Sequence, residues 1–179
     1  MVTYNETFGA AFAGTYYYYP TDRAGLRVVA EKAARSNRRL AARYEDLGFL
    51  DGRCVLRLDS NYESDGTPRF YGVGPGTSAG TESSYRLQET SVKAELGIAY
   101  LGRWQMSGGW RYARTEVLPG LFRTPGVLPS GVQGASTVSA PRLAVARDTR
   151  DVPATPSSGS LAEVFAEFPD RDLGGGATF

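Results

Sequence analysis

The residues with the clearest chemical potential lie together at Asp148, Arg150 and Asp151, where a run of alternating apolar and polar residues ends. Side chains two positions apart on a β-strand share a face, so Asp148 and Arg150 emerge side by side with opposite charges. Two carboxyl groups that flank a substrate can act as acid and base in glycoside hydrolysis. Nothing in the spacing here brings two carboxyl groups together specifically, and the pattern favours a structural ion pair.

Composition excludes most other catalytic chemistry. The chain contains no histidine, so Ser-His-Asp and Cys-His catalysis and histidine-ligated metals are excluded. The single cysteine, Cys54, cannot form an internal disulfide or a thiolate zinc cluster, and it alternates like a small hydrophobic strand residue. We therefore expect no catalytic, cofactor-binding or metal-ligating residues, and no enzymatic activity. The carboxylate pairs that remain have no specific spacing: Asp148 with Asp151, Glu163 with Glu167, and Asp170 with Asp172.

Charge and hydrophobicity narrow the class of protein. Twenty basic and nineteen acidic residues nearly cancel, so no basic surface predicts nucleic-acid binding. A hydrophobic content of 41% is too high for a disordered chain, and no apolar run is long enough to cross a bilayer as a helix. We expect one domain over residues 1–179.

Alternation of apolar and polar residues predicts long antiparallel strands, the first over residues 8–18 and the last over 161–168. Short turns at 20–23, 46–52, 101–103 and 151–159 alternate with breaks near 35–38, 64–84, 118–136 and 169–174. Short turns at one rim and longer loops at the other are typical of membrane barrels. The prediction is an all-β fold, an antiparallel up-and-down transmembrane β-barrel of which about eight or nine strands are visible.

Aromatic residues at strand ends predict a girdle at the membrane interface, where phenol and indole rings prefer to lie. An ordinary aromatic strand end in a soluble sheet is the alternative for the four consecutive tyrosines at 16–19. The candidate girdle residues are Tyr16, Tyr18, Tyr100, Trp104 and Trp110.

Four short motifs, in order along the chain, resemble the bacterial surface antigen family, the barrel domain of BamA/TamA-type outer-membrane proteins. They are YED at 44–46, LDGR at 50–53, RFYGVGP at 69–75, and DTRD at 148–151 followed by Pro156 and Gly159. The resemblance implies a loop motif that includes Phe70, Tyr71, Gly72 and Gly74, and a structural motif of Asp148, Arg150, Asp151, Pro156 and Gly159.

The resemblance also implies a function. Family members lie in the bacterial outer membrane and assemble, insert or translocate outer-membrane proteins, with membrane lipid, unfolded clients and periplasmic modules as partners. The chain departs from the family in three respects. Ser158 stands where the family often has arginine, no lumen-plugging VRG(F/Y) tip is found, and no periplasmic POTRA domain is present.

Residues 24–47 are open to two interpretations. Asp22 and Gly48 could cap a helix with one apolar stripe, formed by Leu26, Val29, Ala30, Ala33, Leu40, Tyr44 and Leu47. The other interpretation gives two strands with a turn at Ser36 and Asn37, because Leu40, Ala42 and Tyr44 alternate with Arg39, Arg43 and Glu45. Local signals favour the helix and the family resemblance favours strands. We predict strands.

Two further folds remain as alternatives: a small self-closed eight-stranded outer-membrane barrel, and a soluble α+β binding domain with a helix at 24–47. A half barrel would leave open edges that cannot lie in lipid. We therefore expect the chain to be a fragment of a larger barrel, with further strands encoded in the flanking gene.

Overall fold

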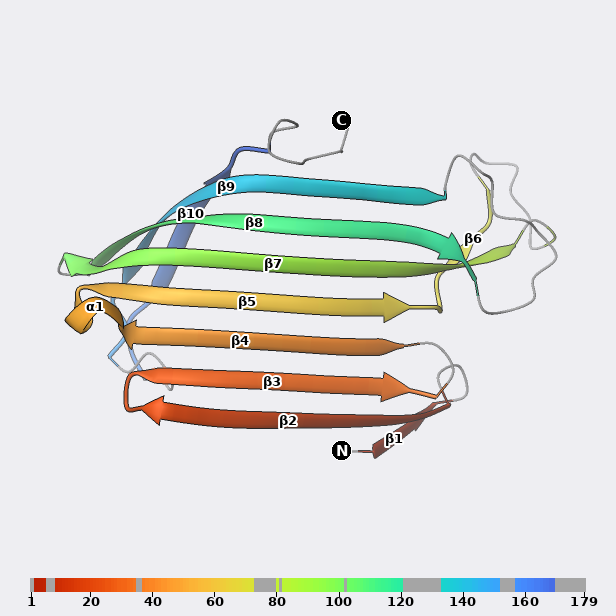
Figure 1. Ribbon diagram of the computed structural model, residues 1–179, viewed down its shortest axis with the longest axis horizontal. Helices are drawn as coiled ribbons and strands as arrows, with labels where there is room; N and C mark the ends of the chain where they lie inside the picture. The colour runs from red at the N-terminus through yellow and green to blue at the C-terminus, as the bar shows by residue number, and fades with distance from the viewer. Residues whose placement is uncertain are drawn as a thin grey trace.

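The computed structural model describes residues 2–5, 9–34, 37–72, 80, 82–101, 103–120, 133–151 and 157–169. It forms one sheet of ten antiparallel strands in a single curved layer (Figure 1). The strands are β1 (Val2–Asn5), β2 (Gly9–Thr21), β3 (Ala24–Ala33), β4 (Arg38–Gly48), β5 (Cys54–Asp65), β6 (Arg69–Phe70), β7 (Ser83–Leu101), β8 (Trp104–Pro119), β9 (Gly134–Asp148) and β10 (Leu161–Glu167).

The topology is an up-and-down meander. Each long strand pairs with its neighbour in sequence, and the two-residue β6 pairs with the start of β7 beside this path. The all-β antiparallel prediction is confirmed. The sheet is not closed, because within the described residues β10 pairs only with β9 and β1 only with β2. The self-closed eight-stranded alternative therefore disagrees with the structure.

Residues 24–33 and 38–48 form β3 and β4, so the prediction of strands is confirmed and the helical alternative is wrong. Ser36 of the predicted turn lies outside the described residues. Val28 pairs with Ala42 and Leu26 with Tyr44, while β2 and β5 pair with the outer edges of the two strands. The helical stripe was real as a sequence pattern. Pairing on both sides outweighs it, because intrinsic helix propensity is a weak preference that tertiary context overrides.

A short turn of helix, α1 (Phe49–Gly52), joins β4 to β5. Its backbone is left-handed at Leu50, Asp51 and Gly52, with φ values of 53°, 60° and 80°. Glycine tolerates this conformation without strain, and aspartate tolerates it better than most residues. The segment is a tight reversal within the short turn predicted at 46–52.

The strand boundaries differ from the sequence-based ones at several ends. β1 was not predicted, β7 begins at Ser83 within the break predicted near 64–84, and β9 begins at Gly134, within the break predicted near 118–136. The turns after β2, β4 and β7 lie at one end of the sheet, and β6 lies at the other end (Figure 1). The break near 169–174 lies largely outside the described residues.

Candidate functional site

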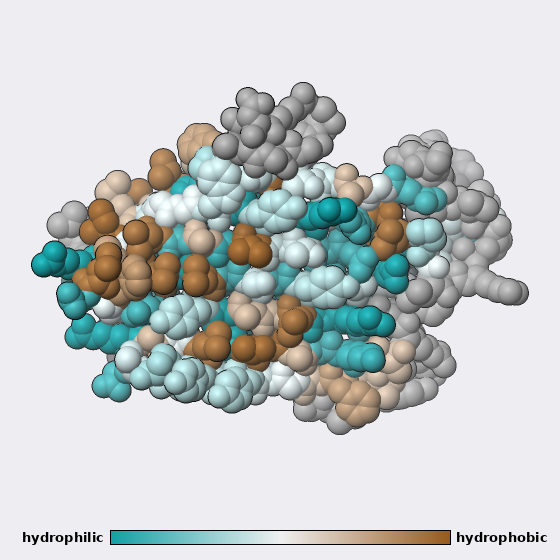
Figure 2. All heavy atoms as spheres, in the orientation of Figure 1, coloured by the Kyte–Doolittle hydropathy of each residue, from teal (hydrophilic) through white to brown (hydrophobic). Residues whose placement is uncertain are grey.

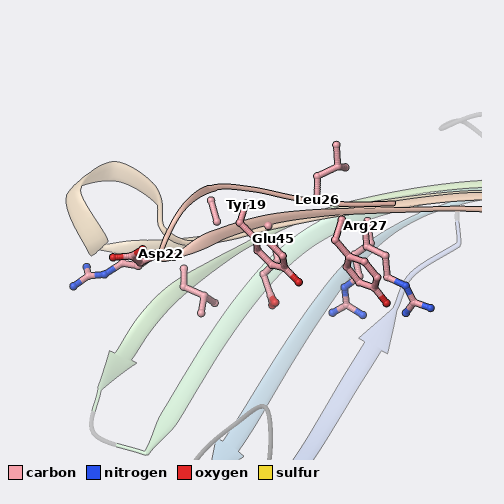
Figure 3. A pocket seen from close by; sticks show the side chains of 11 residues that line it. Tyr19, Asp22, Leu26, Arg27 and Glu45 are labelled. Atoms are coloured by element: carbon pink, nitrogen blue, oxygen red, sulfur yellow. The ribbon is translucent and has the colours of Figure 1, made fainter. Parts of the chain in front are cut away.

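The sheet has two chemically different faces. Directly paired residues share a face, so the strand register assigns each side chain to one of them. Leu26 projects from one face, whereas Arg27 and Glu45 project from the other, into the arch of the sheet (Figure 3). We call these the convex and the concave face. On the convex face one cross-strand row reads Tyr18, Leu26, Tyr44, Leu58, Ala94, Trp110 and Pro141.

The pattern of burial is the reverse of that in a soluble sheet: large apolar side chains on one face are exposed, and polar side chains on the other face are buried. On the convex face Ile98 and Met106 are each 57% exposed and Leu143 is 60% exposed, whereas Glu95 and Gln105 on the concave face are each 6% exposed. Each large apolar side chain left in water forgoes about 1.5–3 kcal/mol of burial energy. A contiguous apolar surface of this extent marks an interaction with lipid or with another protein.

The apolar region crosses the convex face obliquely. One row is apolar at Ala30 and Leu40 on β3 and β4, but polar at Thr90 and Arg114 on β7 and β8. A second row shows the reverse order: it is polar at Asp46 on β4 and apolar where it continues, at Leu56, Leu96 and Leu143. Figure 2 shows the same displacement of hydrophobic residues from one strand to the next.

Tilted strands in a membrane barrel would show an oblique course of this kind. Strands in membrane barrels are tilted by about 35–45°, so a slab of constant depth crosses successive strands at shifted positions. On β8 the convex-face stretch from Trp104 to Tyr112 rises roughly 27 Å at about 3.4 Å per residue. At a tilt of about 40° this corresponds to roughly 21 Å of depth, near the apolar band of about 25 Å in outer-membrane barrels.

On the concave face, charged residues on neighbouring strands form cross-strand rows that contain ion pairs. Asp59 lies between Arg43 and Lys93, at 3.6 and 3.3 Å, and Lys93 also contacts Glu95 at 3.7 Å. In the adjacent row Arg57 Nε donates to Glu45 Oε1 at 2.7 Å. Across β4, β5 and β7 acid and base alternate from strand to strand, so these three strands are tied together through side chains as well as through the backbone.

A second charged cluster ties β8, β9 and β10 together. Arg111 Nε donates to Glu167 Oε1 and Oε2 at 3.0 Å each, and Nη2 donates to Oε2 at 2.7 Å. Arg142 donates to Glu163 Oε1 at 2.6 Å, and its guanidinium lies 3.7 Å from the centroid of the Phe165 ring. Charge-assisted hydrogen bonds between guanidinium and carboxylate groups fix the orientation of both side chains, and here they join β8, β9 and β10. Glu163 and Glu167 are thus occupied by arginines and do not face each other as an acid–base pair.

Asp148 and Arg150 form the ion pair that strand alternation predicts. Arg150 Nη2 lies 2.8 Å from Asp148 Oδ2, and the Arg150 backbone N–H and Nε each donate to Asp148 Oδ1 at 3.0 Å. Asp148 pairs with Leu161 on the concave side of the sheet, beyond the apolar band. Its backbone N–H donates to the carbonyl of Arg103, which places the motif beside the β7–β8 turn.

The rest of this turn is held by its own small residues. Asp151 accepts from the backbone N–H groups of Ser157 and Ser158 and from the Ser157 hydroxyl. The carboxylate therefore has hydrogen-bond donors without an arginine at position 158. Gly159 has φ of 92°, and a Cβ there would lie 2.2 Å from the Thr149 carbonyl oxygen, so only glycine fits. Pro156 lies outside the described residues.

Hydrogen bonds from Arg150 lower the pKa of Asp148 from 3.8 to about 2. The folded-state pKa lies below the unfolded one, so the pair contributes stability fully above about pH 4 and loses it as pH falls toward 2. We expect Asp148 to titrate near pH 2 in an NMR titration of the folded protein, and Arg150→Gln to move the midpoint up. A midpoint near its ordinary value in the unmodified protein would contradict this.

The candidate girdle residues lie on the convex face where their positions are described. Tyr16, Tyr18 and Trp104 are more than half exposed, and Trp110 is 38% exposed. Trp110 Nε1 donates to Ser139 Oγ at 3.0 Å, and Arg147 lies 5.9 Å from the Trp104 ring. The backbone of Tyr100 lies in β7, but its side chain is outside the described set. Tyr112 is not among the predicted girdle residues, although strand alternation places its side chain on the same face.

The loop motif lies at the opposite end of the sheet from Asp148. Phe70 pairs with Ser83, and Ser83 Oγ donates to the Phe70 carbonyl at 3.3 Å. Tyr71 is 46% exposed, and Gly72 has φ of 103°, which favours glycine. Gly74 lies outside the described residues. The two motifs therefore mark opposite rims and form no joint site.

Two further observations bear on function. Within the described residues, no group of three or more cysteine and carboxylate side chains is placed to hold a metal ion. No helix in that part of the chain is long and apolar enough to cross a membrane. The described residues thus provide an apolar convex surface, a polar concave surface and ion pairs between strands.

Comparison with protein-family models finds no match to this chain, and comparison with curated proteins also finds no match. The resemblance to the surface antigen family therefore rests on the four short motifs, and the function it implies stays a prediction.

Proposed function

We propose that this chain forms part of the wall of a transmembrane β-barrel in a bacterial outer membrane. The convex face contacts lipid and the concave face lines an aqueous interior. The oblique apolar region on the convex face carries this proposal, because tilted strands crossing a flat slab produce that displacement. An apolar face that packs on a second protein layer has no reason to follow the tilt of the strands.

The open edges require further strands. Within the described residues β10 has no partner on its outer side, and β1 covers only the first part of β2, from Gly9 to Phe12. Unpaired backbone groups are costly in hydrocarbon. Other strands would complete the wall, in keeping with a partial barrel.

The four motifs support a more specific proposal, that the barrel belongs to the machinery that assembles, inserts or translocates outer-membrane proteins. Its partners would be membrane lipid, unfolded outer-membrane clients and periplasmic modules. The Asp148–Arg150 pair serves this barrel as a structural element at the short-turn rim, because both side chains are occupied by each other.

Adjacent residues on β7 provide the test. Val92 is convex and 49% exposed, and Ser91 is concave. Each is replaced by cysteine in a Cys54→Ser background, and the protein is reconstituted into vesicles. We expect a charged maleimide to label Ser91→Cys at least tenfold faster than Val92→Cys, and a membrane-soluble maleimide to label Val92→Cys efficiently.

Heat-modifiable migration and circular dichroism in detergent and in plain buffer accompany the labelling. A β-rich, heat-modifiable form in detergent supports the barrel. Equal labelling of the two cysteines in vesicles, or a soluble monodisperse protein in buffer alone, would overturn the membrane proposal.

A further inference from the structure

A pocket of about 410 Å³ opens on the concave face beside the β2–β3 turn, where no predicted site residue lies (Figure 3). Its walls come from β2, β3 and β4. Tyrosine and arginine side chains dominate the lining, with Tyr17, Tyr19, Arg23, Arg27, Arg43 and Glu45 as its main polar members. None of these residues belongs to the charged cluster on β8–β10 or to the Asp148 turn.

The aromatic part of the pocket is a ledge made by Tyr17 and Tyr19. Their rings are parallel to within 5°, with centroids 6.4 Å apart. Parallel rings follow from the spacing of two residues along the strand. The space that Gly25 leaves under the Tyr19 ring is a separate feature of this site. A Cβ at Gly25 would lie 3.2 Å from two carbons of the Tyr19 ring, so glycine lets the ring lie flat on the sheet.

The charged part of the pocket has an excess of guanidinium groups. Glu45 is engaged by Arg57 at 2.7 Å, and Asp59 is shared between Arg43 and Lys93. In the described part of the chain, the side chain of Arg27 has no ion-pair partner. The Arg23 guanidinium lies against Gly52 of α1, beside Asp46 and Asp51, and is not counted with it.

We infer that this pocket binds an anionic saccharide. The exposed tyrosine faces suit the C–H face of a sugar ring, and Arg27, 5.9 Å from the Tyr17 centroid, can donate to a phosphate or carboxylate on it. Tyrosine hydroxyls and Glu45 can contact sugar hydroxyls.

The position of the pocket also distinguishes between sources of such a ligand. It opens on the face opposite the apolar region, so a headgroup anchored in the surrounding lipid cannot reach it. The ligand is therefore a soluble saccharide. The choice of a soluble ligand rests on the proposed function, which places lipid at the convex face, whereas the pocket itself does not depend on it.

Calorimetric titration of the full chain with trehalose 6-phosphate, trehalose and inorganic phosphate tests the inference. We expect trehalose 6-phosphate to bind at least tenfold more tightly than either of the others. Tyr19→Ala and Arg27→Gln should each weaken binding fivefold or more. Tyr16→Ala, on the convex face, and Arg39→Gln, concave but outside the pocket, should stay within twofold.

Three results would overturn the inference. Inorganic phosphate binding as tightly as the phosphosugar would show a simple anion site. Adenosine monophosphate binding as tightly would show that the tyrosines accept any ring. Equal losses in pocket and control variants, with the β-sheet signal in circular dichroism unchanged, would show that binding occurs elsewhere.

Discussion

Gly109→Ala is expected to destabilise the protein by about 2–4 kcal/mol, whereas Gly108→Ala should change stability by less than about 1 kcal/mol. A Cβ at Gly109 would lie 2.2 Å from the Ala94 carbonyl oxygen and 2.9 Å from the Glu95 Cα. Both contacts are with backbone atoms of β7, so the strands must separate and lose hydrogen bonds. At Gly108 the nearest atom is Leu143 Cδ2, at an ordinary 3.5 Å.

Urea unfolding followed by tyrosine and tryptophan fluorescence measures the difference, with both variants in the same detergent. The two glycines are adjacent, so composition, strand and loss of backbone flexibility are matched between them. Equal midpoints for the two variants would contradict the pairing of Gly109 with Glu95, and with it the register between β7 and β8. This result bears on the sheet alone and is independent of any ligand or membrane.

The strands were predictable because alternation is a local property of the sequence. Residues 104–115 place Trp104, Met106 and Trp110 on one side of a strand whatever its neighbours are. Residues 24–47 were harder, because their small alanines allow an apolar stripe at helical spacing as well as strand alternation. Pairing with β2 and β5 decides between the two, and such long-range pairing cannot be read from the segment itself.

The pocket shows what sequence alone could not supply. Tyr17 and Arg27 stand ten positions apart and become neighbours only through the β2–β3 register. The same holds for Arg111 and Glu167, which meet across β9 because the sheet curves. Alternation assigns each of these residues to a face. It does not say which residues on that face come into contact.

Leu96→Arg is expected to destabilise the protein in a bilayer by about 2–4 kcal/mol, the cost of arginine near the midplane on the lipid face of a barrel. Leu96 lies between Ala94 and Ile98 within the apolar stretch of β7, and 45% of its side chain is exposed. A charge there would have to leave water for hydrocarbon or distort the bilayer to stay hydrated. Unfolding by urea in lipid vesicles measures the change.

Thr90→Arg is the matched control, because Thr90 lies on the same strand and the same face, in the row that has become polar on β7 and β8. Near the interface arginine costs only about 0–1 kcal/mol, so this variant should keep nearly full stability. The difference in stability between Leu96→Arg and Thr90→Arg shows whether the convex face contacts lipid or water. In water an arginine at a position as exposed as Leu96 shifts stability by about 0.5 kcal/mol or less, so equal stabilities for the two variants would exclude lipid contact at Leu96.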